Sequence, residues 1–185
     1  ILCEKPLCAL GQLQQAHDLS SFMVAYNYRY HPGLKSEEVF KQGSWHFLAR
    51  QYRPEPPEWG LLLDHVSHDL DIVSSQAGQL VIGEVDHRQG PGAEVWTING
   101  QAQGLPFVIS EWVDFKSKTE RVALLKYPDG REVFVDAPEQ MYLDMWRAFL
   151  AGEHNLDEAI STQQLTEDVW QKSQGRQNGS RFPAR

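Results

Sequence analysis

The sequence contains no run of about 18 apolar residues, the length that a helix needs to cross a bilayer. It also has no low-complexity tract and no internal repeat. The basic residues are scattered singly, whereas binding to nucleic-acid phosphates needs clustered Lys and Arg. With 25 acidic against 17 basic residues, the net charge is −8. The sequence therefore predicts a protein that binds neither membrane nor nucleic acid.

Cysteine is scarce as well. The two cysteines, Cys3 and Cys8, have neither the spacing of a C-x-x-C redox pair nor that of a zinc site. So few thiols suit a reducing compartment, and we therefore expect a cytoplasmic protein. Burial as small apolar side chains is the favoured interpretation of both cysteines.

Residues 1–30 have the pattern of a strand, a helix and a second strand. Ile1–Cys3 is apolar, residues 10–19 have leucines at helical spacing, and residues 21–27 are apolar and β-prone. Such a βαβ unit joins two parallel strands by a crossover. Because two strands cannot bury a parallel sheet on both faces, we interpret this part as the end of a larger α/β domain.

Residues 31–175 have a different pattern, in which successive strands are preceded and followed by helices, and this pattern predicts an α+β domain. Short turns between successive strands, such as Pro128-Asp129-Gly130, indicate an antiparallel sheet. Its open face is expected to bind a second copy of the chain, with Trp96, Trp112 and Phe115, together with Val113 on the alternate face, as the apolar surface. Residues 176–185 are polar and predict a tail. The predicted helices are 34–43, 61–78, 138–152 and 156–175, and the predicted strands are 44–52, 80–88, 93–98, 107–115, 121–127 and 131–136.

The helix 61–78 carries the clearest cluster of titratable residues. On an ideal helical wheel, Asp64 and His68 share one narrow face with Ser67, Asp71 and Ser75, opposite an apolar stripe. An Asp and a His at this spacing can hydrogen-bond, which orients the imidazole and favours its use as a general base.

Two alternatives to this catalytic pair stay open. The polar face is also what a solvated amphipathic helix would show, and His65 and Asp69 repeat the same spacing on its flank. No third or fourth ligand is placed by the sequence, so we predict no metal site.

Two further polar segments follow the strands of residues 1–30. Lys5 lies at the carboxyl end of the first strand, where open α/β sheets bind their ligands, and Pro6 fixes the turn that directs it. The segment "YNYRYHP" ends the second strand and offers Asn27, Arg29 and His31. The plain alternative for both segments is a strand end with its polar groups in water.

Taken together, "CEKPL", "YNYRYHP" and "LLLDHVSHDLDIV" occur in the order seen in the Gfo/Idh/MocA oxidoreductases, which the sequence resembles. The resemblance implies a Rossmann-like dinucleotide-binding domain, of which residues 1–30 would be a remnant. It also implies hydride transfer between NAD or NADP and a sugar, nucleotide sugar or cyclitol, and a homo-oligomer. The implied catalytic residues are Lys5, Asp64 and His68, the substrate-binding residues Arg29, His31 and Asp71, and the cofactor-binding residues Glu4, Lys5, Pro6 and Asn27.

The sequence departs from that family in one respect. No glycine-rich fingerprint for the cofactor pyrophosphate is present, because the G-x-G at Gly90 contains Pro91 and precedes a strand. We therefore expect the C-terminal, substrate-side part of an oxidoreductase, inactive by itself. The alternatives are a non-catalytic module that forms homo-oligomers or binds sugars, and an epimerase-like role without net redox change.

Overall fold

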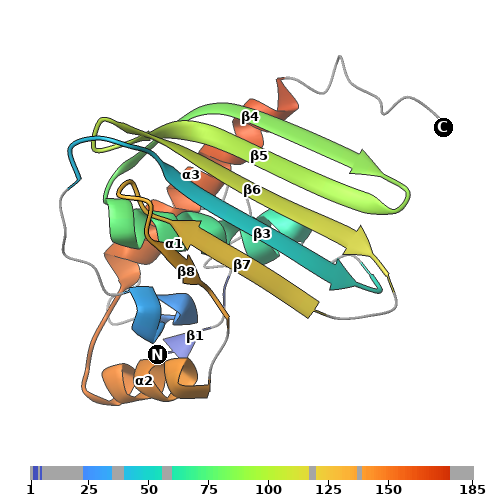
Figure 1. The fold of residues 1–185 in the computed structure, drawn as a ribbon. Coiled ribbons are helices and arrows are strands. Elements are labelled where there is room, and N and C mark those ends of the chain that lie inside the picture. Colours follow the sequence, from blue (N-terminus) through green and yellow to red (C-terminus); the bar gives the residue numbers. More distant parts are fainter. Residues whose placement is uncertain are drawn as a thin grey trace.

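The computed structural model describes residues 2–3, 5, 23–34, 40–55, 60–116, 120–136 and 139–175. Its main element is a six-stranded sheet in the order β4-β5-β6-β3-β7-β8 (Figure 1). The predicted α+β class, an open-faced sheet with helices on one side, is confirmed. The strands are β3 (Trp45–Arg53), β4 (Leu80–Gly90), β5 (Ala93–Ala102), β6 (Leu105–Phe115), β7 (Glu120–Lys126) and β8 (Glu132–Phe134).

One pair in this sheet is parallel. β3 runs parallel to β6, and all other neighbours are antiparallel. The cause is the connection from β3 to β4, which passes through helix α1 (Ser67–Ala77) before β4, β5 and β6 follow one another as hairpins. A crossover through a helix is what parallel pairing requires. β3 thus lies between β6 and β7 in the middle of the sheet.

Tight turns fix the register of the hairpins. Gln103 and Gly104 connect β5 to β6, and both have positive φ angles, 52° and 82°. Two such residues form the turn whose twist matches that of the flanking strands. The hairpin predicted at Pro128-Asp129-Gly130 joins β7 to β8, with the Arg131 amide donating to Asp129 Oδ1 at 2.9 Å.

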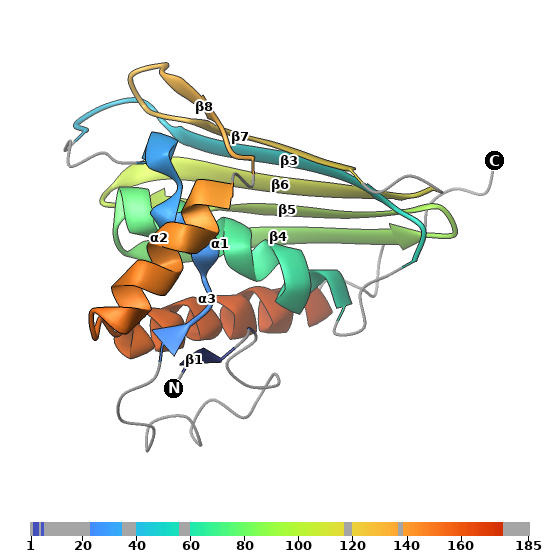
Figure 2. The ribbon, with the colours of Figure 1, turned by 90° about the horizontal axis from the view of Figure 1, so that it is seen from below.

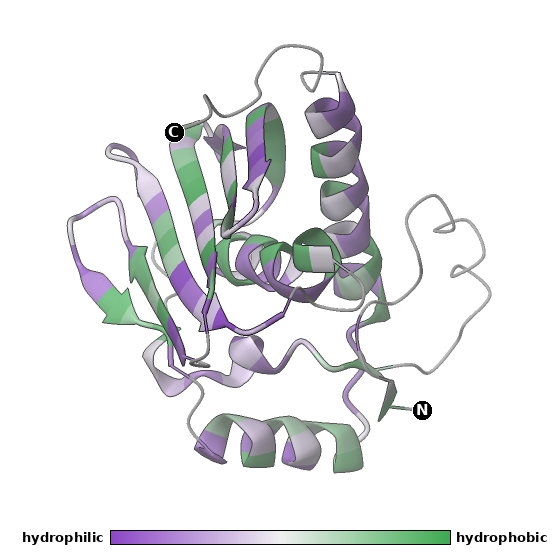
Figure 3. Cartoon of the chain, turned by 90° about the vertical axis from the view of Figure 1, so that its right-hand side faces the viewer, coloured by the Kyte–Doolittle hydropathy of each residue, from purple (hydrophilic) through white to green (hydrophobic). Residues whose placement is uncertain are grey.

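The helices lie on one face of the sheet (Figure 2). α1 and α3 (Leu156–Gln174) pack against this inner face, while α2 (Glu139–Leu150) packs on a separate small cluster around Met23. Hydrophobic and hydrophilic bands alternate along the strands, as expected when one face is buried (Figure 3). None of the described helices is long and apolar enough to cross a membrane.

The alternation of buried and exposed residues along the strands shows that the apolar surface predicted for the open face is wrong in part. Trp96 and Val113 are 4% and 0% exposed and belong to the core, and Phe115 packs against that core. Of the four residues predicted there, Trp112 lies on the open face, with 46% exposure. Trp96 lies opposite Glu111 in the β5–β6 register, so its side chain points to the inner face.

The N-terminal part forms a sheet of its own. β1 (Leu2–Cys3) pairs in parallel with β2 (Met23–Val24), as the βαβ pattern predicts. The predicted helix 10–19 and Cys8 lie outside the described residues. The predicted strand 21–27 ends early, because Asn27–Tyr30 form a 3₁₀ turn, η2.

The helix predicted to end at Gly43 is wrong at its C-terminal end. Phe40 is not helical and residues 41–43 form a bend, while residues 35–39 lie outside the described ranges. The Phe40 ring packs edge-on against Trp45 at 5.3 Å and also contacts Tyr127. This contact with the sheet core takes the place of a last helical turn.

Candidate active site

Lys5 and Asp64 form an ion pair. Lys5, just after β1, donates from Nζ to Asp64 Oδ1 at 2.9 Å and to the Asp64 backbone carbonyl. The pair joins the β1–β2 unit to the helix that precedes α1. The burial of Lys5 lowers the pKa of its ammonium group, although Asp64 opposes that shift. The structure thus brings together two of the three residues predicted to be catalytic.

Asp64 holds further partners that the sequence did not indicate. His65 Nε2 lies 3.1 Å and Arg53 Nη1 3.3 Å from Asp64 Oδ2, and the same Arg53 nitrogen lies 3.0 Å from His65 Nε2. The hydrogen bond with His65, together with the charge of Lys5, lowers the pKa of Asp64 far below its ordinary value. The carboxylate is therefore ionised and holds Lys5 in a fixed position.

The predicted helix contains a π-helical turn, η4 (Leu62–Val66), before α1. The Asp64 carboxylate bonds to Lys5, Arg53 and His65. The predicted Asp64–His68 hydrogen bond is absent from the described contacts, and His68 Nδ1 is buried without a partner there. The alternative of a solvated face is wrong for Ser67, His68 and Asp71, which are 2%, 8% and 0% exposed, whereas Ser75 of that face is exposed.

The His68 ring lies between two tyrosines. Tyr26 and Tyr28 meet it edge-on, with centroids at 5.8 and 5.1 Å and interplanar angles of 89° and 82°. Its burial, and next the positive charge of Lys5, lower the pKa of His68 well below its ordinary value of 6.5. The imidazole is therefore neutral at neutral pH, the state in which it can accept a proton.

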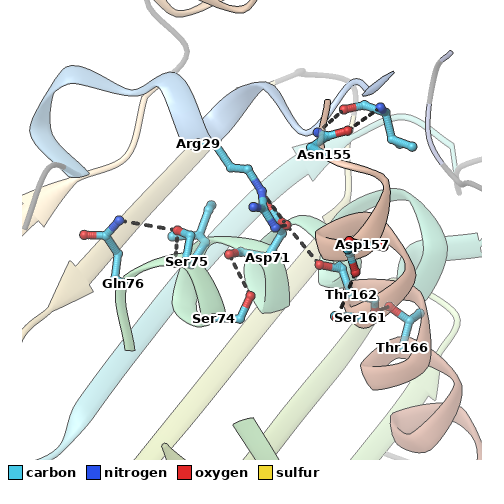
Figure 4. Close-up of polar contacts among 12 residues, drawn as sticks. Arg29, Asp71, Ser74, Ser75, Gln76, Asn155, Asp157, Ser161, Thr162 and Thr166 are labelled. Carbon is cyan, nitrogen blue, oxygen red and sulfur yellow. Dashed lines mark hydrogen bonds and ion pairs between the residues drawn. The ribbon is translucent and has the colours of Figure 1, made fainter. Parts of the chain in front are cut away.

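Arg29 and Asp71, two predicted substrate-binding residues, bind each other (Figure 4). Arg29 Nε lies 2.9 Å from both Asp71 oxygens, its Nη2 also donates to Oδ1, and Thr162 Oγ1 on α3 donates to Oδ1 at 2.9 Å. Burial raises the pKa of Asp71, against the opposing charge of Arg29. The pair joins η2, α1 and α3, which are far apart in the sequence.

Both ring nitrogens of His31 have hydrogen-bond partners. The Gly33 amide donates to Nδ1 at 3.1 Å, so the proton lies on Nε2, which donates to Asp136 at 2.8 Å. These bonds connect the turn at Gly33 with Asp136, 105 positions after His31, and a substrate-binding role remains a prediction. Asn27 differs, because its Oδ1 is buried without a hydrogen-bond partner in the described part of the chain. Glu4 and Pro6 lie outside that part.

Two hollows are present in the surface of the described part of the chain. One of about 780 Å³ lies between α1 and α3, beside Arg29, Ser74 and Glu158. The other, of about 1010 Å³, lies over the open face of the sheet around Trp112. Neither is lined by Lys5, Asp64 or His68. Within the described ranges, no three His, Cys, Asp or Glu side chains lie together as metal ligands.

Sequence reasoning missed a buried charged trio, Asp69, Glu111 and Arg121. One signal could have revealed it. In β6 and β7, Glu111 and Arg121 occupy positions that alternate with outward-facing residues and are followed by Val113, Ala123 and Leu125 on the buried face. A charge in such a row is buried with its partners or faces a site.

No protein-family model matches the sequence, and no curated protein matches it. Solved structures match it over most of its length. A myo-inositol dehydrogenase from Corynebacterium glutamicum superposes with a TM-score of 0.70 at 13% identity, covering 94% of this chain and 70% of that one. The fold is that of the Gfo/Idh/MocA oxidoreductases.

Two further structures show what this fold accommodates. A levoglucosan dehydrogenase in complex with NADH has a TM-score of 0.63 at 13% identity, covering 94% of this chain and 71% of that one. The transcriptional regulator Gal80p from Kluyveromyces lactis has a TM-score of 0.68 at 8% identity, covering 94% and 67%. At such identities the likeness shows a shared fold, and fold alone does not fix function.

Proposed function

We propose that this chain carries the substrate-side half of the active site of an NAD(P)-dependent oxidoreductase. Its substrate would be a CH–OH group of a sugar, nucleotide sugar or cyclitol. The observation that carries the proposal is the Lys5–Asp64 ion pair beside the buried, neutral imidazole of His68. Active sites typically combine a buried ion pair with a group that can accept a proton, and the residues often come from distant parts of the chain.

The chemistry assigned to each residue follows from its state. Oxidation of an alcohol removes a proton from oxygen and a hydride from carbon, and NAD(P), when bound, supplies the hydride acceptor. The neutral His68 accepts the hydroxyl proton. The ammonium group of Lys5 binds the substrate oxygen and stabilises the negative charge that develops on it. Asp64 fixes Lys5 and lies close enough to bind a neighbouring hydroxyl.

The described residues fit one end of the cofactor. The buried Asn27 Oδ1 without a partner accords with a polar ligand such as the nicotinamide carboxamide, and Lys5 lies at the end of the neighbouring strand. Glu4 and Pro6 complete the proposed set. Nothing in the printed sequence has the glycine pattern that binds the pyrophosphate. We therefore propose that the 185 residues bind NADH or NADPH weakly by themselves, and that they do not turn over substrate alone.

The proposed organisation follows the sheets. Residues 1–30 would be the remnant of a dinucleotide-binding domain, residues 31–175 the substrate-binding and oligomerisation domain, and residues 176–185 a tail. In support, β1 and β2 form a separate sheet, and Met23 belongs to a separate apolar cluster with α2. A cytoplasmic location remains part of the proposal.

A substrate screen tests the proposed activity. Sugars, sugar acids, nucleotide sugars and cyclitols are incubated with NAD⁺ or NADP⁺, and reduced cofactor is followed by its fluorescence. The assay uses both this chain and the longest reading frame that contains it. We expect reduced cofactor from one substrate class in the longer protein. If the longer protein binds a substrate of one of these classes and no reduced cofactor forms, the proposal is contradicted. An isomerised sugar product would favour the epimerase-like alternative.

A second candidate function, a non-catalytic assembly module, is favoured by the open face of the sheet. Leu48, Trp112, Val122 and Phe134 are 49%, 46%, 49% and 68% exposed on adjacent strands. An apolar surface of this kind, across several strands, is typical of an interface. We propose that a second copy of the chain covers it.

Sedimentation distinguishes an interface from a free surface. We expect the wild-type chain to form dimers or larger assemblies, and Trp112→Glu to dissociate them, because the variant buries a carboxylate at the centre of the contact. Leu150→Glu is the control, since Leu150 is 79% exposed on α2, away from the sheet. A monomer at high wild-type concentration would contradict the interface.

A further inference from the structure

The buried trio of Asp69, Glu111 and Arg121 lies between α1 and the inner face of the sheet. Arg121 Nη2 on β7 donates to Asp69 Oδ1 on α1 and lies 3.5 Å from Glu111 Oε2 on β6. Both carboxyl groups have no exposed area, and the Arg121 side chain is 13% exposed. The trio therefore attaches α1 to the middle of the sheet at the residue directly after His68.

Arg121 also contacts the ring that packs against His68. Its guanidinium lies 5.5 Å from the centroid of the Tyr28 ring, in a cation–π arrangement. The Tyr28 ring in turn meets the His68 ring edge-on at 5.1 Å. Arg121 is thus connected to His68 in two ways. It binds the side chain of Asp69, the next residue in α1, and it contacts Tyr28, whose ring packs against the His68 ring.

One member of the trio, Arg121, places a positive charge near His68. Burial, and next the adjacent Asp69, raise the pKa of Glu111 well above its ordinary value, so Glu111 keeps its proton. Arg121 Nη2 donates to Asp69 Oδ1. The positive charge of Arg121 adds to burial and to Lys5 in lowering the pKa of His68. The titratable groups on the elements around His68 are Lys5, Tyr26, Tyr28, Asp64, His65, Asp69, Glu111 and Arg121.

We propose that Arg121 is the positioning residue for His68. It holds Tyr28 against the imidazole ring and ties α1 to the sheet at Asp69, so that the ring keeps one orientation beside a fixed positive charge. The effect of Arg121 on catalysis rests on the proposed function, in which His68 is the general base. The orientation and protonation of His68 are properties of the folded chain and can be measured without substrate.

Imidazole NMR of the 185-residue chain tests the inference. The His68 signals are assigned by their loss in His68→Gln, and their pH titration is compared with that of Arg121→Met. In the wild type we expect His68 to stay neutral through pH 6.5 and its ring protons to show ring-current shifts from Tyr26 and Tyr28. In Arg121→Met the titration should move upward, toward pH 6.5, and these shifts should shrink.

Two comparisons make the test specific. Arg50→Met removes an arginine that also has a carboxylate partner and aromatic contacts, Asp114 and Tyr52, but on the open face, and it should leave His68 unchanged. Arg121→Lys keeps the charge and loses the planar stacking group. It should restore most of the titration and less of the ring-current shift.

Arg121→Lys decides the result if Arg121→Met does not fold, because it keeps a positive charge beside Asp69 and loses the planar group that lies over Tyr28. It should reduce the ring-current shifts of His68. Unchanged ring-current shifts of His68 in a folded Arg121→Met, or in Arg121→Lys, would overturn the inference.

Turnover separates this inference from the proposed function. In the active protein, Arg121→Met should lower kcat/KM by up to about 100-fold, since small displacements of a catalytic group have effects of that size. The acid limb of the pH profile should shift in the same direction as the NMR titration. If His68→Ala leaves turnover intact, the proposed function fails and the NMR result still decides the role of Arg121.

Discussion

His68→Ala should lower kcat by about 10²- to 10⁴-fold, the range typical of general acid–base catalysis, while cofactor affinity stays close to that of the wild type. His68 is the buried, neutral proton acceptor of the proposed site, and no other described histidine lies between Tyr26 and Tyr28. Steady-state turnover with the substrate found by the screen measures the effect. His46→Gln is the control, because His46 bonds to Ser44 at the start of β3. Equal turnover in the two variants would remove His68 from the mechanism.

The pH profile of kcat/KM should show the lowered pKa of His68. A base acts in its neutral form, and burial moves the pKa of this imidazole well below 6.5. Activity should therefore hold as the pH falls to about 6.5 and decline only at lower pH, where His68 takes up its proton. Over the same range, unfolding becomes easier, because the unfolded chain binds a proton that the folded chain excludes. An acid limb centred at or above pH 6.5 would show that another group is the base.

The largest effect on stability is expected from Asp71→Asn. The variant leaves the guanidinium of Arg29 without its carboxylate in a site where Asp71 has no exposed area. Breaking a buried ion pair at one side costs about 3–5 kcal/mol of unfolding free energy. Urea denaturation followed by circular dichroism measures the loss.

A double replacement and an exposed pair serve as controls. Arg29→Met combined with Asp71→Leu should recover much of the loss, since replacing both members of a buried pair by apolar groups leaves no charge unpaired. Asp114→Asn breaks the pair with Arg50, which is 54% exposed, and should cost less than about 1 kcal/mol. A loss of similar size in Asp71→Asn and Asp114→Asn would contradict the structural role given to Arg29 and Asp71.

The strands, the hairpins and the last two helices could be predicted from the sequence because they depend on local patterns. Alternation in β6, the Pro128-Asp129-Gly130 turn and the apolar spacing in α2 are each contained in a short segment. The parallel pairing of β3 with β6 could not be predicted in this way, because the two strands lie about 60 positions apart and either could pair elsewhere. The alternation does not show which face is buried, and the prediction placed Trp96 and Phe115 on the open face, whereas Trp96 belongs to the core and Phe115 packs against it.

The residues of the candidate site could be proposed from the sequence, but their contacts could not. Lys5, Asp64 and His68 follow from motifs, and the structure places Lys5 against Asp64. The ideal wheel predicted a bond between Asp64 and His68, whereas the Asp64 carboxylate bonds to Lys5, Arg53 and His65. The wheel also assumed that one face of α1 is exposed to solvent, whereas the sheet and α3 cover Asp69 and Asp71. Partners supplied by other strands and helices carry no local signal.

The central place of β3 has a consequence for the order of folding. β4, β5 and β6 follow one another along the chain and can pair as hairpins as soon as they are formed. β3 comes earlier in the chain, yet both of its neighbours, β6 and β7, come later. Its insertion must close a long loop that includes α1, and such non-local pairing is slow. Until then β3 has two free edges, so a nascent or refolding chain is most exposed to wrong strand pairing there.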